Sequence, residues 1–261
     1  MSTSDSMTMS VPGVKLRMEH VGMVFARDDQ NVSVLEDIKL DVRDGEFVCI
    51  LGPSGCGKST LLNVMGGFLS PTRGSVSIDG ETVHGPDPRR ILVFQERGVF
   101  PWLTVEGNIG FGLSKLSRAE RDRRIAHYVQ MTRLQGFEHT YPSDLSGGMK
   151  QRLQVARALA VNPDILYLDE PFGALDSVTR FIMRGELLRI WQTERRTIIF
   201  VTHDIDEAVQ LADRVVVLSS RPAKIQDILT IDIAHPRNLS SPRYLEHRDD
   251  LLKKIGLAYA V

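Results

Sequence analysis

The strongest indication of architecture in this chain is the run GPSGCGKST at residues 52–60. It matches the pattern G-x-x-x-x-G-K-[ST], in which a glycine-rich loop joins a strand to a helix and binds phosphate. The apolar run EFVCIL, residues 46–51, comes before it and predicts a buried strand. The run STLLNVMGGF, residues 59–68, predicts the helix that follows. An ordinary glycine turn before a helix is the alternative, but the pattern arises by chance in only about one chain in a hundred of this length.

Each residue type in this run has a role in holding a triphosphate. Glycine tolerates positive φ, so successive backbone N–H groups can turn towards one phosphate. The helix N-terminus contributes about 0.3–1 kcal/mol for a nearby anion, which is too little for selective binding. We therefore expect Lys58 to place a full charge at the β- and γ-phosphates and Ser59 to ligate Mg²⁺. The predicted nucleotide contacts in the loop are Gly52, Pro53, Ser54, Gly55, Cys56, Gly57, Lys58, Ser59 and Thr60.

A second apolar strand, ILYLD at residues 165–169, ends in two acids. Its C-terminal end is where ligands bind in open α/β sheets, so Asp169 is expected to hold Mg²⁺ directly or through water. Glu170 is suited to polarise the attacking water. Alone, a strand that ends in Asp-Glu is usually no more than a strand end. The presence of Lys58 in the same chain gives the pair its functional interpretation.

The run LSGGMKQR at residues 145–152 predicts a second anion-binding device. Ser146 is expected to cap the helix that follows, and Gly147 and Gly148 expose backbone N–H groups. An ordinary capped helix would also account for the pattern. The chain already has a phosphate loop for its own ATP. A second anion-binding helix terminus is explained if that terminus binds the ATP of another molecule.

Strands alternate with helices in the second half of the chain, where ILYLD, TIIFVTH and RVVVLS are the apolar runs. This alternation predicts an α/β fold with a parallel sheet. Residues 14–50 contain short β-like runs, whereas about 97–160 are charged and favour an inserted helical subdomain. We expect a flexible tail at 1–13 and a short C-terminal tail at 231–261, with a helix near LEHRDDLLKKIG. Core packing is expected for the one-sided stripe of Val178, Phe181, Ile182 and Leu188.

Composition excludes several classes of protein. The 261 residues carry 32 basic and 33 acidic side chains, and this net charge of -1 argues against broad binding to nucleic acid or anionic lipid. The two cysteines, Cys49 and Cys56, indicate a reducing cytosol and no disulfide framework. The N-terminus does not resemble a secretory signal, and the apolar runs are too short to cross a bilayer. If the protein works at a membrane, another chain must span it.

In order along the chain, GPSGCGKST, the glutamine of VFQER, LSGGMKQR, ILYLDEP, GALD and the histidine of FVTHD closely resemble the nucleotide-binding subunit of ABC transporters. The resemblance covers roughly residues 14–230, and LSGGMKQR is its most specific element, since other P-loop NTPases lack it. It implies a P-loop NTPase fold with a RecA-like core and an N-terminal antiparallel β subdomain. It also implies that two copies of the chain bind Mg-ATP between them and hydrolyse it to drive transmembrane permease subunits. The implied location is peripheral, on the cytoplasmic face of the membrane, with a solute-binding protein as an indirect partner and no nucleic acid.

The resemblance also implies roles for single residues. Phe25 stands where an aromatic stacks on adenine, although a core phenylalanine at a strand end is the alternative. Gln95 corresponds to the glutamine that senses Mg²⁺ and the γ-phosphate and links to the permease, and His203 to a histidine that contacts the γ-phosphate. Asp176 would set the geometry across the dimer interface. The γ-phosphate of the opposite protomer would be contacted by Ser146, Gly147 and Gly148. The expected catalytic residues are Glu170, His203 and Gln95, and the expected Mg²⁺ ligands are Ser59, Gln95 and Asp169.

Two further runs and the tail are similar to the nitrate/sulfonate/taurine importer subgroup: FPWLTV at 100–105, IDEAVQLADRVVVLSSRPAKI after His203, and IAHPRN at 233–238. Trp102 is expected near the permease, although it could simply pack the helical subdomain. Taurine, an alkanesulfonate, nitrate and other small molecules stay open as cargo, because the cargo does not touch this chain.

The main rival is a soluble ABC-type ATPase that acts on ribosomes, DNA repair or cluster assembly. A single nucleotide-binding unit, the lack of a coiled-coil insertion or metal-ligand cysteines, and PWLTV stand against it. LSGGMKQR and the missing guanine-reading motif stand against a P-loop kinase or GTPase. A non-enzymatic binding module is disfavoured by the joint presence of Lys58, Asp169, Glu170 and His203.

Overall fold

The computed structural model describes residues 13–27, 30–94, 98–173 and 175–256. The chain forms two compact units, of which the first combines Met1–Asp87 with His203–Val261 and the second is Pro88–Thr202. The helical subdomain expected at about 97–160 lies inside the second unit, which also contains strands. The structure contains the predicted α/β arrangement with parallel strands and an N-terminal antiparallel β subdomain.

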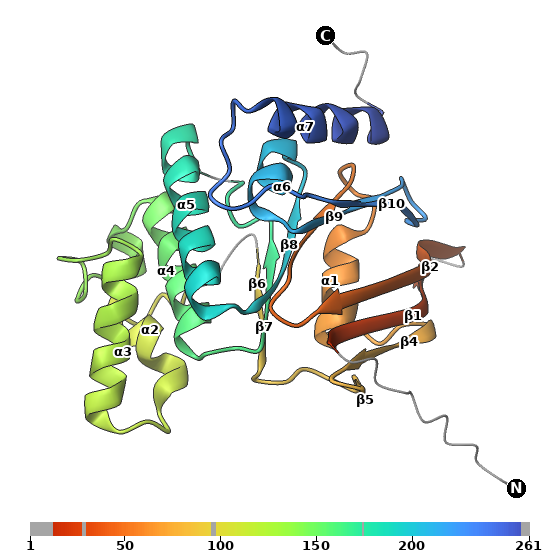
Figure 1. Ribbon diagram of the computed structural model, residues 1–261. Helices are drawn as coiled ribbons and strands as arrows, with labels where there is room; N and C mark the ends of the chain where they lie inside the picture. The colour runs from red at the N-terminus through yellow and green to blue at the C-terminus, as the bar shows by residue number, and fades with distance from the viewer. Residues whose placement is uncertain (1–12, 28–29, 95–97, 174, 257–261) are drawn as a thin grey trace, which may run out of the picture. The chain divides into compact units, whose positions relative to one another are not determined.

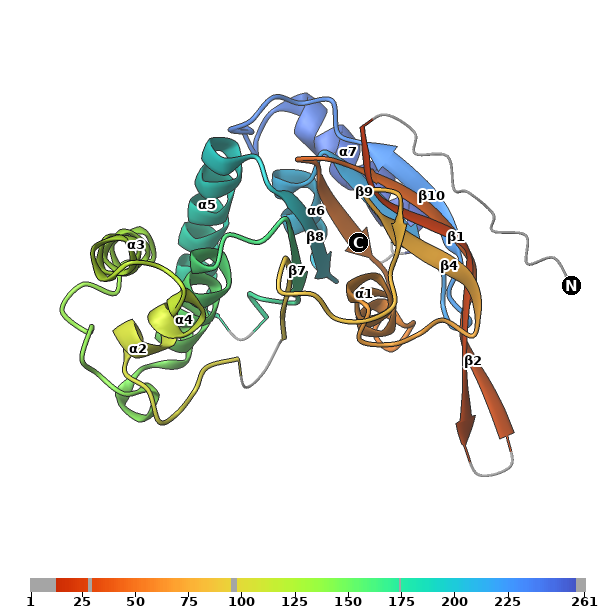
Figure 2. The ribbon, with the colours of Figure 1, turned by 90° about the horizontal axis from the view of Figure 1, so that it is seen from below.

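An antiparallel sheet occupies the N-terminal part of the first unit (Figure 1). Its strand order is β2-β1-β4-β5, and each neighbouring pair is antiparallel. Alternate side chains of β1, such as Leu16 and Met18, are buried, as the period of two in a half-buried strand requires. Figure 2 shows β1 and β2 extending together as a long ribbon. The strands are β1 (Val14–Arg27), β2 (Gln30–Arg43), β4 (Arg73–Ile78) and β5 (Glu81–Thr82).

The first unit also holds a group of three strands in the order β10-β9-β3. All five residues of β3 (Phe47–Leu51) are buried, as the run EFVCIL predicts. Strand β9 (Arg214–Leu218) pairs parallel to β3, whereas β10 (Ile225–Thr230), which we did not expect, pairs antiparallel to β9. The reason is the short connection between β9 and β10, because a parallel return needs a long crossover. The helices of this unit are α1 (Lys58–Gly66), α6 (Ile205–Leu211) and α7 (Pro242–Lys254).

The second unit combines three parallel strands with helices. The strand order is β8-β7-β6, and both pairs are parallel. Helices α2, α3 and α4 pack on one another (Figure 2). The strands are β6 (Arg90–Val93), β7 (Ile165–Asp169) and β8 (Thr197–Thr202). The helices are α2 (Val105–Gly110), α3 (Arg118–Met131), α4 (Gly147–Ala160) and α5 (Ser177–Glu194), with 3₁₀ turns η1 (Phe111–Leu113) and η2 (Pro142–Asp144).

Helix α5 corrects one prediction. Val178 and Phe181, expected in the core, are 66% and 59% exposed, whereas Leu188 is buried as predicted. The buried face of the helix passes through Leu187 and Trp191 instead. Val178 precedes Leu187 by about two and a half turns at 3.6 residues per turn, so it lies on the opposite side. The predicted stripe is thus exposed at Val178 and Phe181, half-buried at Ile182, and part of the core only at Leu188.

The longest helix, α5, has 18 residues. No helix in the part of the chain that the structure describes is both long and apolar enough to cross a membrane.

Asn108 fixes the start of the helical part of the second unit. Its side chain is fully buried and accepts a hydrogen bond from the Phe100 backbone N–H at 2.7 Å. Its amide nitrogen lies within hydrogen-bonding distance of the carbonyls of Phe100, Leu103 and Thr104, each at 3.0 Å. One side chain therefore ties the FPWLTV run to the helix that follows it.

Replacing Asn108 with alanine should destabilise this region by about 1–3 kcal/mol, because the Phe100 N–H loses its acceptor and the Leu103 carbonyl loses the amide donor. Amide hydrogen exchange should accelerate across residues 98–110 and stay unchanged in β3. The matched control is Asn31→Ala, since Asn31 is exposed on the β1–β2 ribbon. Exchange at 98–110 equal to that of the unaltered protein would show that the Asn108 hydrogen bonds contribute nothing.

Candidate functional site

The phosphate loop leaves β3 and enters α1 through two glycines with positive φ. Gly55 has φ 74° and Gly57 has φ 122°, conformations that residues with a side chain rarely adopt. A Cβ atom on Gly57 would also come within 2.9 Å of the Val34 side chain. At Gly55 an added Cβ would meet nothing within 4 Å, so this part of the loop is open. The loop can therefore present backbone N–H groups to an anion.

Lys58 is the first residue of α1 and is only 5% exposed. Its ammonium donates to the carbonyls of Gly52 at 2.9 Å and Pro53 at 3.0 Å, so its charge is held at the loop. The first turn of α1 carries no acidic side chain. The positive helix terminus and the ammonium thus add to one another, and the loop fits a phosphate chain. Ser59 is exposed and Thr60 half-buried in the same turn.

Both cysteines are buried and free of disulfides. Burial raises the pKa of the Cys49 thiol well above its ordinary value. Burial also raises the pKa of Cys56, although the nearby Lys58 charge opposes the shift. Raised values keep both groups as unreactive thiols, which suits their interpretation as small packing residues.

The two acids at the end of β7 belong to the second unit. Asp169 pairs in parallel register with Val201 of β8, and both acids are half-buried. Glu170 has φ 45°, and its backbone N–H donates to the Val201 carbonyl at 3.0 Å. A residue other than glycine in this conformation costs about 1–3 kcal/mol, and such strain concentrates at functional sites. The turn after the strand thereby fixes the direction in which the Glu170 side chain leaves the sheet.

Ser146 is the N-cap of α4, and its hydroxyl accepts from the Met149 N–H at 3.3 Å. Gly147 and Gly148 form the first turn, which contains no acidic residue. An added Cβ on Gly147 would meet nothing within 4 Å. This helix terminus is therefore open and partly positive, as an anion site requires.

Asp176 and His203 each stand immediately before a helix or its cap. Asp176 is the N-cap of α5 and accepts from the N–H groups of Val178 at 3.1 Å and Thr179 at 3.0 Å. The hydrogen bond with Thr179 lowers the pKa of this exposed carboxyl. His203 is exposed and directly precedes Asp204, the N-cap of α6, which accepts from the Glu207 N–H at 3.1 Å. His203 is thus the single residue between Thr202, the last residue of β8, and the N-cap of α6.

Of the two remaining predicted contacts, the structure describes Phe25 but not Gln95. Phe25 pairs with Val32 on the β1–β2 ribbon and is 37% exposed, so it is not a core residue. Gln95 lies outside the described residues. The phosphate loop, Phe25 and His203 belong to the first unit. The second unit contains Ser146, Gly147, Gly148, Asp169, Glu170 and Asp176.

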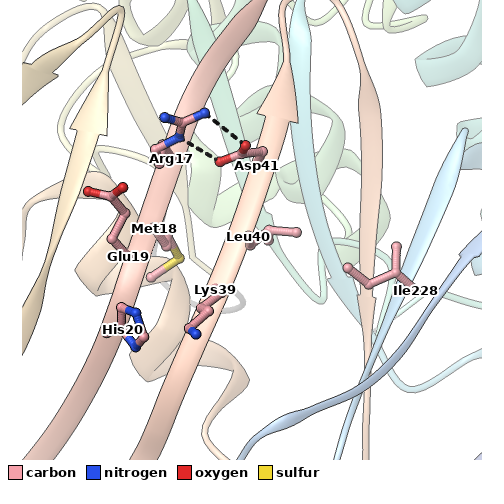
Figure 3. A pocket seen from close by; sticks show the side chains of 8 residues that line it. All are labelled: Arg17, Met18, Glu19, His20, Lys39, Leu40, Asp41 and Ile228. Atoms are coloured by element: carbon pink, nitrogen blue, oxygen red, sulfur yellow. Dashed lines mark hydrogen bonds and ion pairs between the residues drawn. The ribbon is translucent and has the colours of Figure 1, made fainter. Parts of the chain in front are cut away.

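A hollow of about 610 Å³ in the first unit is separate from these residues. Figure 3 shows it between β1, β2 and β10, with Arg17 donating to Asp41 through two hydrogen bonds of 2.9 and 3.0 Å. His20, on the same wall, pairs with Asp37 at 2.7 Å. Two basic side chains that line the hollow, Arg17 and His20, are therefore already paired with carboxylates of the same sheet. None of the predicted nucleotide contacts lines the hollow. The described residues also contain no cluster of three or more His, Cys, Asp or Glu side chains that suits a metal ion.

Comparison with known proteins gives consistent results. Residues 35–173 match the family described as ABC transporter. The chain is 46% identical over 241 residues to an uncharacterised ABC transporter ATP-binding protein of Methanocaldococcus jannaschii, covering 92% of this chain and 90% of the relative. It is 43% identical over 248 residues to the aliphatic sulfonates import ATP-binding protein SsuB of Bacillus cereus, covering 95% and 96%.

Solved structures agree with this result. A dimeric bacterial ABC transporter cassette superposes with a TM-score of 0.76 at 32% identity, covering 84% of this chain and 100% of that one. A dimeric cassette in a post-hydrolysis state, bound to ADP and Pi, superposes with a TM-score of 0.75 at 31% identity and the same coverage. The predicted family is confirmed, and this chain belongs to the ABC transporters as one of their ATP-binding, ATP-hydrolysing subunits.

Proposed function

We propose that two copies of this chain bind ATP between them and that its hydrolysis energises the import of a small molecule such as taurine, an alkanesulfonate or nitrate. The observation that carries the proposal is the presence of two open, acid-free helix termini, at Lys58 and at Ser146. The likeness to the aliphatic sulfonate importer subunit supports the importer class and the kind of cargo.

In this mechanism each terminus holds one side of the triphosphate. The N–H groups of the phosphate loop and the Lys58 ammonium bind the β- and γ-phosphates of one protomer's ATP. The partner's α4 terminus, with its Ser146 hydroxyl and the N–H groups of Gly147 and Gly148, binds the γ-phosphate from the other side. ATP then favours the closed dimer because only that state supplies both termini. The dimeric cassettes to which the chain is similar support this arrangement.

Hydrolysis removes the group that both protomers share. Glu170 accepts a proton from the attacking water, and His203 stabilises the γ-phosphate during the reaction. Asp176 sets the approach of one protomer to the other, and Phe25 stacks on the adenine. Once the γ-phosphate leaves, the α4 terminus has no anion to hold and the dimer reopens.

The donor set proposed for Mg²⁺ suits that ion. Ser59, Asp169 and Gln95 provide hydroxyl, carboxylate and amide oxygens, which are the hard ligands that Mg²⁺ prefers. When bound, Mg²⁺ neutralises phosphate charge and orients the oxygens of the leaving group.

An exposed aromatic cluster in the second unit is proposed to contact a transmembrane permease. Phe100 stacks on Trp102 with ring centroids 5.2 Å apart and contacts Phe111 at 4.4 Å. Arg157 lies over the Phe100 ring at 4.3 Å, which fixes the centre of the cluster. Trp102 and Phe111 are 67% and 58% exposed, and exposed apolar patches of this kind mark interaction surfaces. The chain would then sit on the cytoplasmic face of the membrane, and a solute-binding protein would act through the permease.

Glu170→Gln should bind ATP but hydrolyse it at least about a hundred-fold more slowly, because a catalytic base contributes about 10²–10⁴ in rate. On size-exclusion chromatography with ATP, this variant should accumulate as a dimer. The control is Glu81→Gln, an exposed acid on β5 with no proposed role. Near-normal turnover by Glu170→Gln would remove Glu170 from its proposed role.

Trp102→Ala should leave the ATPase rate of the purified chain within about two-fold of normal, since Trp102 is an exposed aromatic that contacts Phe100 and has no proposed contact with the nucleotide. It should strongly reduce recovery of the permease when the tagged chain is purified from detergent-solubilised membranes, because interface tryptophans are frequent hot spots. Phe137→Ala, an exposed aromatic outside this cluster, is the control. If no membrane protein accompanies the unaltered chain, the soluble ABC-type ATPase becomes the better interpretation.

A further inference from the structure

The C-terminal segment, residues 231–251, holds α6 at both ends. Helix α6 has only seven residues, and isolated helices of this length are unstable in water. Its position must therefore come from packing and from hydrogen bonds with other parts of the first unit. Helix α7 packs against α6, as Figure 1 shows, and α6 also packs against β3, the strand that leads into the phosphate loop.

Arg237, in the IAHPRN run, satisfies the C-terminal end of α6. It is only 8% exposed, and its Nη1 donates to the carbonyls of Val209 at 2.5 Å and Ala212 at 2.8 Å. Its Nε donates to Ile233 at 2.9 Å and its Nη2 to Ile231 at 3.3 Å. A cation at the last carbonyls of a helix is favoured by the helix dipole. The guanidinium thus joins the end of α6 to the segment that follows β10.

Tyr244, on α7, holds the other end of α6. Its ring is 1% exposed, and its hydroxyl lies 3.2 Å from both the backbone and the side-chain oxygen of Asp206. Asp206 belongs to the first turn of α6. The first turn is thereby attached to α7, and the last turn to Arg237.

His203 lies immediately before this braced helix. Its neighbour Asp204 caps α6, so a displacement of the helix displaces the backbone from which His203 projects. We propose that Arg237 and Tyr244 are positioning residues that set the location of His203 for the γ-phosphate. This inference rests on the function proposed above for His203. It also assigns a role to the IAHPRN run, which contains none of the predicted nucleotide contacts.

The test is a double-mutant cycle on the ATPase of the full-length chain. Tyr244→Phe removes only the hydroxyl, and Arg237→Met removes the guanidinium but keeps much of its length. Arg237→Met should lower kcat about ten-fold and Tyr244→Phe about three-fold, with KM for ATP within about two-fold, because small displacements of a catalytic group reduce rate more than binding. In a His203→Ala background neither substitution should lower kcat further, since each acts through His203.

Arg243→Met is the matched control, because Arg243 lies in the same segment but pairs with Asp232 at 2.7 Å and Glu246 at 2.9 Å on the surface. It should leave kcat unchanged. The proposal is overturned if the substitutions lower kcat equally with and without His203, or if Tyr244→Phe and a folded Arg237→Met both keep full kcat. If Arg237→Met does not fold, the Tyr244→Phe cycle alone decides. Full activity of the single variant His203→Ala would instead contradict the role of His203, which is a separate outcome.

Discussion

Neutralisation of a highly charged anion by the positive ends of helices is the interaction on which the proposed function depends. Helix α1 begins with a buried lysine whose ammonium is held at the loop by two carbonyls. Helix α4 begins with a capping serine and two glycines, of which Gly147 has open space around it. Helix dipoles alone are weak, about 0.3–1 kcal/mol each, and the proposed site therefore combines a full charge at Lys58 with a second terminus. Strand β3 leads directly into the first of these termini.

Short elements in the first unit depend on neighbours for their position. Strand β3 is fully buried and carries the phosphate loop, while α6, which packs on it, is too short to hold itself. Arg237 and Tyr244 supply the missing anchors from the C-terminal segment. In the proposed account, this C-terminal segment carries no nucleotide contact but determines where His203 lies.

Local sequence predicted those features that local physics controls. FVCIL and ILYL are buried strand segments because they are almost entirely apolar, and Gly55 and Gly57 of the phosphate loop have the positive φ values that such a loop uses. Val178 and Phe181 were misplaced because periodicity finds an apolar stripe without showing which face meets the core. Strand β10 was missed because its alternation is weak, and the anchoring by Arg237 because it depends on carbonyls distant in sequence. Gln95 lies outside the described residues, so the structure does not test its role.

Subunit complementation tests most directly whether each ATP is held by two protomers. Lys58→Ala removes one half of the site, and Gly147→Asp puts a negative charge at the other half without hindering a helix N-terminus, where Asp is favourable. Each purified variant should be inactive alone. Mixed in equal amounts, they should recover about a quarter of the normal ATPase rate, because half of the dimers are mixed and each of these has one complete site. A mixture as inactive as its components would contradict a site shared between two copies of the chain.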